Sequence, residues 1–134
     1  MDWRFEAVVV PVADMDRAKQ FYEQAGFYLD VDHRAGDFRV IQVTPVGSAC
    51  SVILLRNVGT PGSLQGLHLV VRDIDAARAE LVERGIEVSD VYHFKDGAQA
   101  PGPDPDRADY GSFLSFSDPD GNGWMVQEVR SRPS

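Results

Sequence analysis

The stretch VADMDRAKQFYEQAGF, residues 12–27, recurs 59 positions later as VRDIDAARAELVERGI, residues 71–86. The two copies share Val, Asp, Asp, Ala and Gly at five of sixteen aligned positions. Each copy follows a β-rich run and reaches an aspartate, Asp14 or Asp73, of the kind that caps the amino terminus of a helix. Apolar side chains then recur at helical spacing. The chain therefore encodes a strand and a helix twice.

Each predicted helix is followed by short strands and turns, beginning after Gly26 in the first copy and after Gly85 in the second. The runs with strand character are residues 28–33, 38–44, 51–55, 86–94, 112–117 and 123–129. The pattern predicts an α+β fold of two tandem βαβββ modules, at about residues 1–60 and 61–134 of one domain. We expect a curved eight-stranded sheet, or half-barrel, around a central cleft that binds the ligand.

The second copy alone contains a long segment rich in proline and glycine, HFKDGAQAPGPDPDRADYG, residues 93–111. Long irregular loops are often lids or binding loops, and an excursion without function is the alternative. If the segment folds over the cleft, His93, Phe94 and Tyr110 lie at the cleft mouth. The rings of Phe94 and Tyr110 then offer a surface on which a flat ligand stacks.

Charge and composition exclude several classes of partner. Thirteen basic and twenty-one acidic residues give a net charge of −8, which repels nucleic acid and anionic membranes. No apolar run has the length of a spanning helix, and the first residues lack the pattern of a secretory signal. The single cysteine forms no internal disulfide. We therefore expect a soluble protein of the reducing cytoplasm.

Three motifs in order resemble a known family: VPVADMDRAKQFYEQAGF (10–27), LHLVVRDIDAARAELVERGIEV (67–88) and SFSDPDGNGWMVQE (115–128). Together with the repeat they are similar to the glyoxalase, bleomycin-resistance and extradiol-dioxygenase superfamily, also called the vicinal oxygen chelate fold. Its members include lyases, isomerases, epimerases, dioxygenases, thiol transferases and metal-free drug-binding proteins. The resemblance also implies a homodimer.

The resemblance implies four strand positions for the ligands of a divalent ion, usually His, Glu or Gln. Carried over to this sequence, the four positions are Ala7, Leu54, Gly66 and Met125. None has the oxygen or imidazole donor that such an ion prefers. The sequence therefore predicts no metal cofactor, and the alternative is a divalent ion held by displaced ligands.

Alternation along a strand places the residue two positions further on the same face. On that rule Val9, His68 and Gln127 point into the cleft, and strand parity adds Arg39. The predicted ligand contacts are His68, Gln127, Met125, Leu54, Val9, Arg39, Phe94 and Tyr110. Structural roles stay open: His68 as an imidazole bonded to the backbone, Gln127 paired with a neighbouring strand, and Arg39 on the surface.

The segment DPDGNG, residues 118–123, imitates the opening of an EF-hand calcium loop. Its twelfth position is Val129, and Glu128 comes one residue early. The flanking residues also have strand character, so we interpret the segment as a turn between two strands.

Three functions are consistent with these residues. The first is a metal-free protein that binds a small, flat or apolar organic molecule in its cleft. The second is an enzyme: a metal-dependent lyase, isomerase or dioxygenase with displaced ligands, or a metal-free catalyst with His68 as general base. The third is a domain that acts through protein contacts, and Trp3 and Phe5 are apolar residues compatible with an interface.

Overall fold

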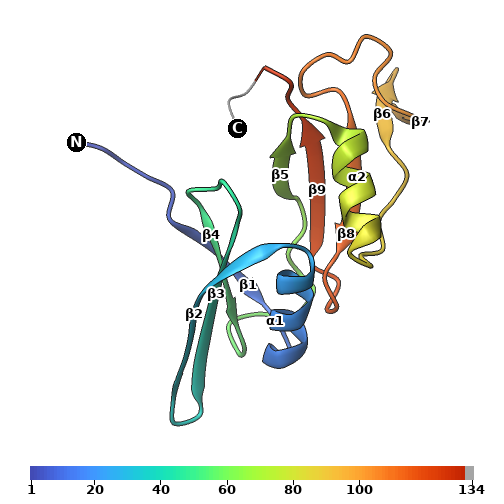
Figure 1. Ribbon diagram of the computed structural model, residues 1–134. Helices are drawn as coiled ribbons and strands as arrows, with labels where there is room; N and C mark the ends of the chain where they lie inside the picture. Colours follow the sequence, from blue (N-terminus) through green and yellow to red (C-terminus); the bar gives the residue numbers. More distant parts are fainter. Residues whose placement is uncertain (132–134) are drawn as a thin grey trace. The chain divides into compact units, whose positions relative to one another are not determined.

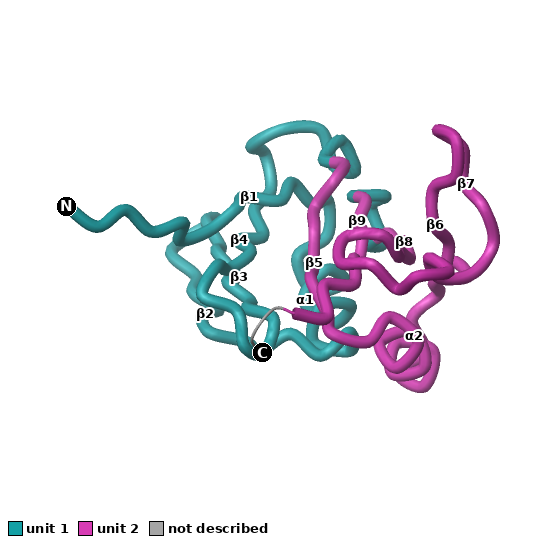
Figure 2. Tube along the Cα trace, turned by 90° about the horizontal axis from the view of Figure 1, so that it is seen from above, with its two compact units in different colours: residues 1–64, 118–122 teal, residues 65–117, 123–134 magenta. Residues whose placement is uncertain are grey.

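The computed structural model describes residues 1–131, which form two helices and nine strands (Figure 1). The elements are β1 (Ala7–Pro11), α1 (Met15–Gln24), β2 (Phe27–Ala35), β3 (Phe38–Pro45), β4 (Ser51–Leu55), β5 (Leu67–Val71), α2 (Ile74–Glu83), β6 (Tyr92–Lys95), β7 (Ala98–Pro101), β8 (Phe113–Ser117) and β9 (Gly123–Glu128). The chain divides into two compact units (Figure 2). Unit 1 comprises residues 1–64 and 118–122, and unit 2 the rest of the described chain.

Each unit contains one sheet and one of the two repeated strand and helix segments. The strand order is β1-β4-β3-β2 in unit 1 and β5-β9-β8-β6-β7 in unit 2. The first and last strands of each unit pair in parallel, and the other pairs are antiparallel. The predicted α+β class is therefore confirmed. In place of one eight-stranded sheet, the described residues have two sheets, of four and five strands. The ninth strand is β7, which the proline-rich segment contributes.

Both helices begin at the aspartate that the sequence indicates. The Asp14 carboxylate accepts a hydrogen bond from the Arg17 backbone N–H at 3.0 Å, and Asp73 accepts from the Ala76 N–H at 3.1 Å. Such caps satisfy amide groups that have no partner within the helix. Gly26, just beyond α1, has a φ of 102°, which a residue with a Cβ atom adopts only under strain. The repeated aspartate and glycine residues therefore specify where each helix starts and stops.

Helix α1 covers one face of the sheet of unit 1, and the core lies between them. The fully buried side chains on this side are Val10, Ala18, Tyr22, Ile41, Val43 and Leu54. In unit 2, α2 packs on β8 and β9 in the same way, over Leu114, Phe116, Trp124 and Val126. Phe116 and Trp124, both buried, stack with ring centroids 6.0 Å apart. One face of each sheet is thus left without a helix.

The turn between β8 and β9, residues 118–122, belongs to unit 1, although both strands belong to unit 2. The Tyr22 hydroxyl donates to Asp118 Oδ2 at 2.8 Å, and Asn122 Nδ2 donates to the Pro11 carbonyl at 2.9 Å. The Asp118 carboxylate also accepts from the backbone N–H groups of Asp120 and Asn122. The segment is the turn between two strands that the sequence predicts, and its hydrogen bonds make it a structural part of unit 1.

Among residues 1–131 no helix has the length and apolar character needed to cross a membrane.

Candidate functional site

The face of the unit 2 sheet opposite α2 brings together four of the eight predicted site residues. In the pairing of strands β5, β9 and β8, His68 lies beside Met125, and Met125 lies beside Ser115. The next row on the same face runs through Val70, Gln127, Phe113 and Tyr92. We call the surface formed by His68, Val70, Tyr92, Phe94, Phe113, Ser115, Met125 and Gln127 the open face of unit 2. The predicted common face of His68, Met125 and Gln127 is confirmed.

His68 is exposed on this face, and its ring orientation is fixed by the backbone. Its Nδ1 atom lies 3.0 Å from the carbonyl oxygen of Gly66. A carbonyl oxygen only accepts hydrogen bonds, so Nδ1 carries a proton. In the neutral imidazole the other nitrogen, Nε2, then has a free lone pair. His68 therefore makes the predicted hydrogen bond to the backbone and is still exposed on the open face.

Gln127 connects the open face of unit 2 to the long segment. Its Nε2 donates to the carbonyl oxygen of Tyr110 at 3.1 Å. Tyr110 has a φ of 69°, and its N–H donates to the Glu128 carbonyl at 2.8 Å. The Tyr110 ring is 54% exposed. Residues 102–112 are therefore held against β9, and Tyr110 lies beside the open face.

Glu128 anchors the same segment through its side chain, which has no exposed surface. Its carboxylate accepts from Arg107 Nε at 3.0 Å and Nη2 at 2.5 Å, and from the Ile74 N–H, the first of α2, at 2.9 Å. The hydrogen bonds from Arg107 lower the pKa of Glu128 most, against the opposing effect of burial. Glu128 and Arg107 were missed from the sequence. A charged residue in the buried phase of a strand was the available signal, because such a residue needs a partner.

Three aromatic rings form one edge of the open face of unit 2. Tyr92 and Phe113 stack with centroids 5.8 Å apart, and Phe94 meets both rings edge-on, at 5.8 and 5.4 Å. Phe94 is 50% exposed, whereas the other two are buried. The Tyr92 hydroxyl lies 2.6 Å from Ser115 Oγ, so its polar end is satisfied. Phe94 therefore presents a ring that its neighbours hold in place.

A hollow of about 280 Å³ opens where β5 and β9 begin. Gly66, Ser115 and Met125 are among its lining residues. Two of the four positions inferred for metal ligands, Gly66 and Met125, thus line one hollow with a glycine and a thioether.

In unit 1 the corresponding face carries Val9, which is 44% exposed and pairs with Ile53. The prediction that Leu54 shares this face is wrong: Leu54 pairs with Val10 and is fully buried on the helix side. Side chains alternate along a strand, so the error of one residue reverses the face. Ile53 occupies the position that corresponds to Met125, because it lies beside Val9 as Met125 lies beside His68.

The prediction that Arg39 points away from the helix is also wrong. Arg39 donates to both carboxylate oxygens of Asp32 at 2.9 Å and to Asp16 on α1 at 2.8 Å, and its side chain is only 11% exposed. These hydrogen bonds lower the pKa of both aspartates and raise that of Arg39. Arg39 therefore joins β3 to α1 by charge pairing.

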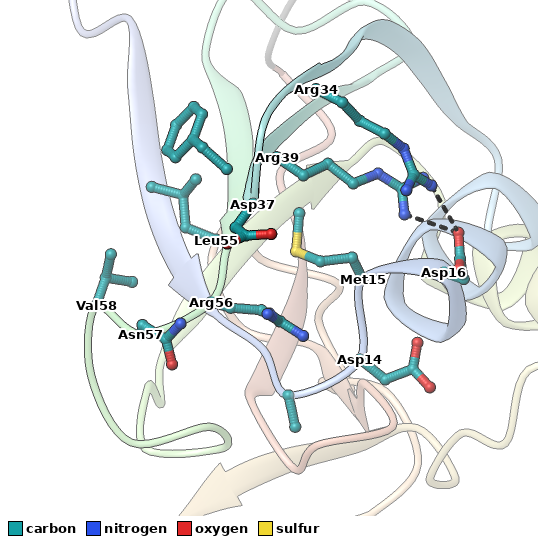
Figure 3. A pocket seen from close by; sticks show the side chains of 12 residues that line it. Asp14, Met15, Asp16, Arg34, Asp37, Arg39, Leu55, Arg56, Asn57 and Val58 are labelled. Atoms are coloured by element: carbon teal, nitrogen blue, oxygen red, sulfur yellow. Dashed lines mark hydrogen bonds and ion pairs between the residues drawn. The ribbon is translucent and has the colours of Figure 1, made fainter.

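Figure 3 shows the hollow around Arg39, which has a volume of about 830 Å³. Arg34 and Arg39 converge on Asp16, and Arg56 lies on the opposite wall (Figure 3). The lining contains three arginines and three aspartates, so its formal charges cancel. Arg34 and Arg39 already form ion pairs with Asp16. This hollow is accordingly a weaker candidate for a ligand site than the open face of unit 2.

The metal implied by the resemblance does not fit these residues. Ala7, Gly66 and Met125 have no carboxylate or imidazole, and neither Leu54 nor Ile53 supplies one. Within residues 1–131 no group of three or more His, Cys, Asp or Glu side chains is placed to hold an ion. Catalytic ions normally have about three protein ligands.

The model of the Glyoxalase/Bleomycin resistance protein/Dioxygenase superfamily matches residues 4–126 of this chain. The chain belongs to this superfamily. The match confirms the resemblance seen in the three motifs and includes both repeats.

Similar proteins of known structure include two from Streptomyces sp. CB03234. TnmS3, an antibiotic binding protein, is 37% identical, with a TM-score of 0.75 and coverage of 96% of this chain and 97% of that one. A glyoxalase/bleomycin resistance protein is 38% identical, with a TM-score of 0.71 and coverage of 93% and 100%. The uncharacterized protein YetH of Bacillus subtilis (strain 168) is 27% identical over 90% of this chain and 94% of its own length.

Proposed function

We propose that this protein binds a small, flat organic molecule on the open face of unit 2 without a divalent ion, and thereby sequesters it. One observation carries the proposal: the positions inferred for metal ligands on this face are Gly66 and Met125, and the same face carries a half-exposed ring at Phe94. Apolar and aromatic linings with a few polar groups are typical of organic ligand sites. TnmS3 is an antibiotic binding protein, which supports an antibiotic as the ligand class.

The proposed ligand contacts are His68, Met125, Gln127, Phe94 and Tyr110. Val9, on the corresponding face of unit 1, stays a prediction. Leu54 and Arg39 are withdrawn, because both lie on the helix side of their sheet. A homodimer in the cytoplasm is part of the proposal, and the exposed Trp3 and Phe5 are compatible with an interface.

The test is a calorimetric titration of chelator-treated, tag-free protein with bleomycin and with a planar polycyclic antibiotic such as doxorubicin. We expect saturable binding to at least one compound, unchanged when Zn²⁺, Mn²⁺ or Fe²⁺ is added back. Binding that appears only with a restored ion contradicts the proposal, and so does a stoichiometric metal in the untreated protein. Either result favours the metal-dependent lyase, isomerase or dioxygenase.

A matched pair of variants locates the site. Phe94→Ala removes the exposed ring of the aromatic edge, whereas Phe38→Ala removes a similarly exposed ring from unit 1. We expect Phe94→Ala to weaken binding about tenfold, because it removes both contact area and ring stacking. Phe38→Ala leaves the affinity unchanged. Equal effects of the two substitutions place the ligand elsewhere.

A further inference from the structure

Two polar side chains on the open face of unit 2, those of His68 and Gln127, each donate a hydrogen bond to the protein backbone. His68 Nδ1 donates to the Gly66 carbonyl at 3.0 Å, and Gln127 Nε2 donates to the Tyr110 carbonyl at 3.1 Å. A carbonyl offers lone pairs only, so the donor roles of these two atoms are fixed. The atoms left over are His68 Nε2 and Gln127 Oε1, and within residues 1–131 neither has a hydrogen-bond partner.

These two remaining atoms have the same character. Nε2 of the neutral imidazole and the Gln127 amide oxygen are both acceptors. Burying an acceptor beneath a ligand that brings no donor leaves it unsatisfied, and that loss weakens binding. A complementary ligand therefore brings hydrogen-bond donors to this face.

The strand pairing also gives the scale of the surface. His68 pairs with Met125, and Gln127 lies two residues further along β9, so the two acceptors are diagonal neighbours. Strand spacing of about 4.8 Å and a rise of about 3.3 Å per residue put their Cα atoms about 8 Å apart. From Val70 on β5 to Tyr92 on β6 the row crosses four strands, a width of about 14 Å. Such a surface is suited to two or three fused rings.

We propose that the open face of unit 2 selects flat aromatic molecules that carry hydrogen-bond donors, such as phenolic hydroxyl groups, and that His68 Nε2 accepts one of them. The rings of the ligand lie toward Phe94 and its neighbours. This proposal rests on the proposed function and names the ligand class for the same site.

Two commercial three-ring probes, phenanthrene and 9-phenanthrol, differ by one hydroxyl group and test the proposal by fluorescence titration. The measured quantity is the ratio of their dissociation constants in each protein. The two probes differ in hydration free energy, but this difference is the same for every protein variant and cancels when the ratios are compared. We expect the preference for 9-phenanthrol to be about fivefold larger in the wild type than in His68→Phe.

His93→Phe is the matched control. His93 Nδ1 also contacts a backbone carbonyl, that of Gly102 at 2.8 Å. It lies between Tyr92 and Phe94 on β6 and therefore points to the opposite side of the sheet. The same chemical change is thus made off the open face, and we expect this variant to keep the wild-type preference.

The failures are distinguishable. If both probes bind and the preference is the same in the wild type and in His68→Phe, the role of His68 is overturned while the proposed binding function stands. If neither probe binds to the folded wild type, the flat-ligand proposal fails, and this inference fails with it.

Discussion

Glu128 is a carboxylate without exposed surface in a strand whose other inward side chains, Trp124 and Val126, are apolar. Its two oxygens are satisfied by Arg107 and by the first N–H of α2. One residue thus joins a strand, a helix and the segment that carries Tyr110. Burying a charge is favourable only when the partners are complete, so this position tolerates few substitutions.

Glu128→Ala should lower the free energy of unfolding by about 3 kcal/mol, because it leaves Arg107 without its main partner and empties a buried space. Urea denaturation followed by circular dichroism measures the change. Glu87→Ala is the control, since Glu87 is exposed, and it should stay within about 0.5 kcal/mol of the wild type. Equal stability of the two variants contradicts the role assigned to Glu128.

The same carboxylate predicts a pH dependence. Arg107 lowers the pKa of Glu128 below its ordinary value of 4.5. A lowered folded-state pKa means that the stabilisation is fully present above pH 4.5 and is lost as the pH falls through the folded value. Urea midpoints measured from pH 5 down to pH 2 should therefore fall less steeply in Glu128→Gln than in the wild type. Parallel slopes contradict the prediction.

Single residues also show why part of the site was predicted wrongly. Val9 lies beside Ile53 and then Gln42, just as His68 lies beside Met125 and then Ser115. Equivalent residues of β3 and β8, such as Gln42 and Ser115, are therefore 73 positions apart in the sequence. The similar turn sequences near the ends of these strands, TPVG (44–47) and DPDG (118–121), are 74 positions apart. That difference of one residue reversed the predicted face of Arg39, and an equal error on β4 reversed Leu54.

The elements themselves were predicted more reliably, because each helix carries signals at both ends. An aspartate cap, helical apolar spacing and a terminal glycine all agree in α1 and α2. The predicted side-chain faces were correct on β1, β5 and β9, because a sequence motif next to each of these strands fixes which residue is counted first. The hairpin of β6 and β7 had no such anchor. Its pairing is set by contacts within the long segment, and the same segment is fixed by Glu128, whose partner Arg107 is distant in sequence.

Packing between distant elements gives a prediction at this scale. Gly62, in the connection between β4 and β5, lies against the turn of residues 118–122 with a φ of 82°. A Cβ atom there would lie 2.1 Å from the Asp120 carbonyl oxygen, far inside contact distance. Gly62→Ala should therefore lower the free energy of unfolding by more than about 3 kcal/mol, measured by urea denaturation.

Gly36→Ala is the control for that substitution. Gly36 has a similar φ of 61°, and a Cβ atom there meets nothing within 4 Å. Its replacement should cost about 1 kcal/mol, from the backbone conformation alone. If the two alanine variants have equal stability, Gly62 is not required for the close approach of the turn.

At the scale of the whole molecule, neither unit is a continuous piece of chain. Residues 118–122 supply unit 1 with Asp118 and Asn122, which satisfy the Tyr22 hydroxyl and the Pro11 carbonyl. The repeat predicts a module boundary near residue 60, whereas unit 1 runs to residue 64 and also includes residues 118–122. Sequence similarity between the copies gave no sign that residues 118–122 belong to unit 1, because these residues have the composition of an ordinary hairpin turn.

A fragment of residues 1–64 should consequently fail to fold alone, whereas the full chain unfolds cooperatively. The fragment lacks the turn, so the Tyr22 hydroxyl loses its hydrogen bond to Asp118. Circular dichroism during heating compares the two chains. A fragment with a cooperative transition near that of the full chain would show that the turn is dispensable.

The borrowed turn also sets an order of events during synthesis. Unit 1 is not complete until residue 122 has left the ribosome, although its own sheet and helix are translated before residue 65. The amino-terminal half of the nascent chain therefore waits, with its aromatic core unfinished, while most of the second half is made. During that interval the early half must avoid aggregation without the five residues that complete it.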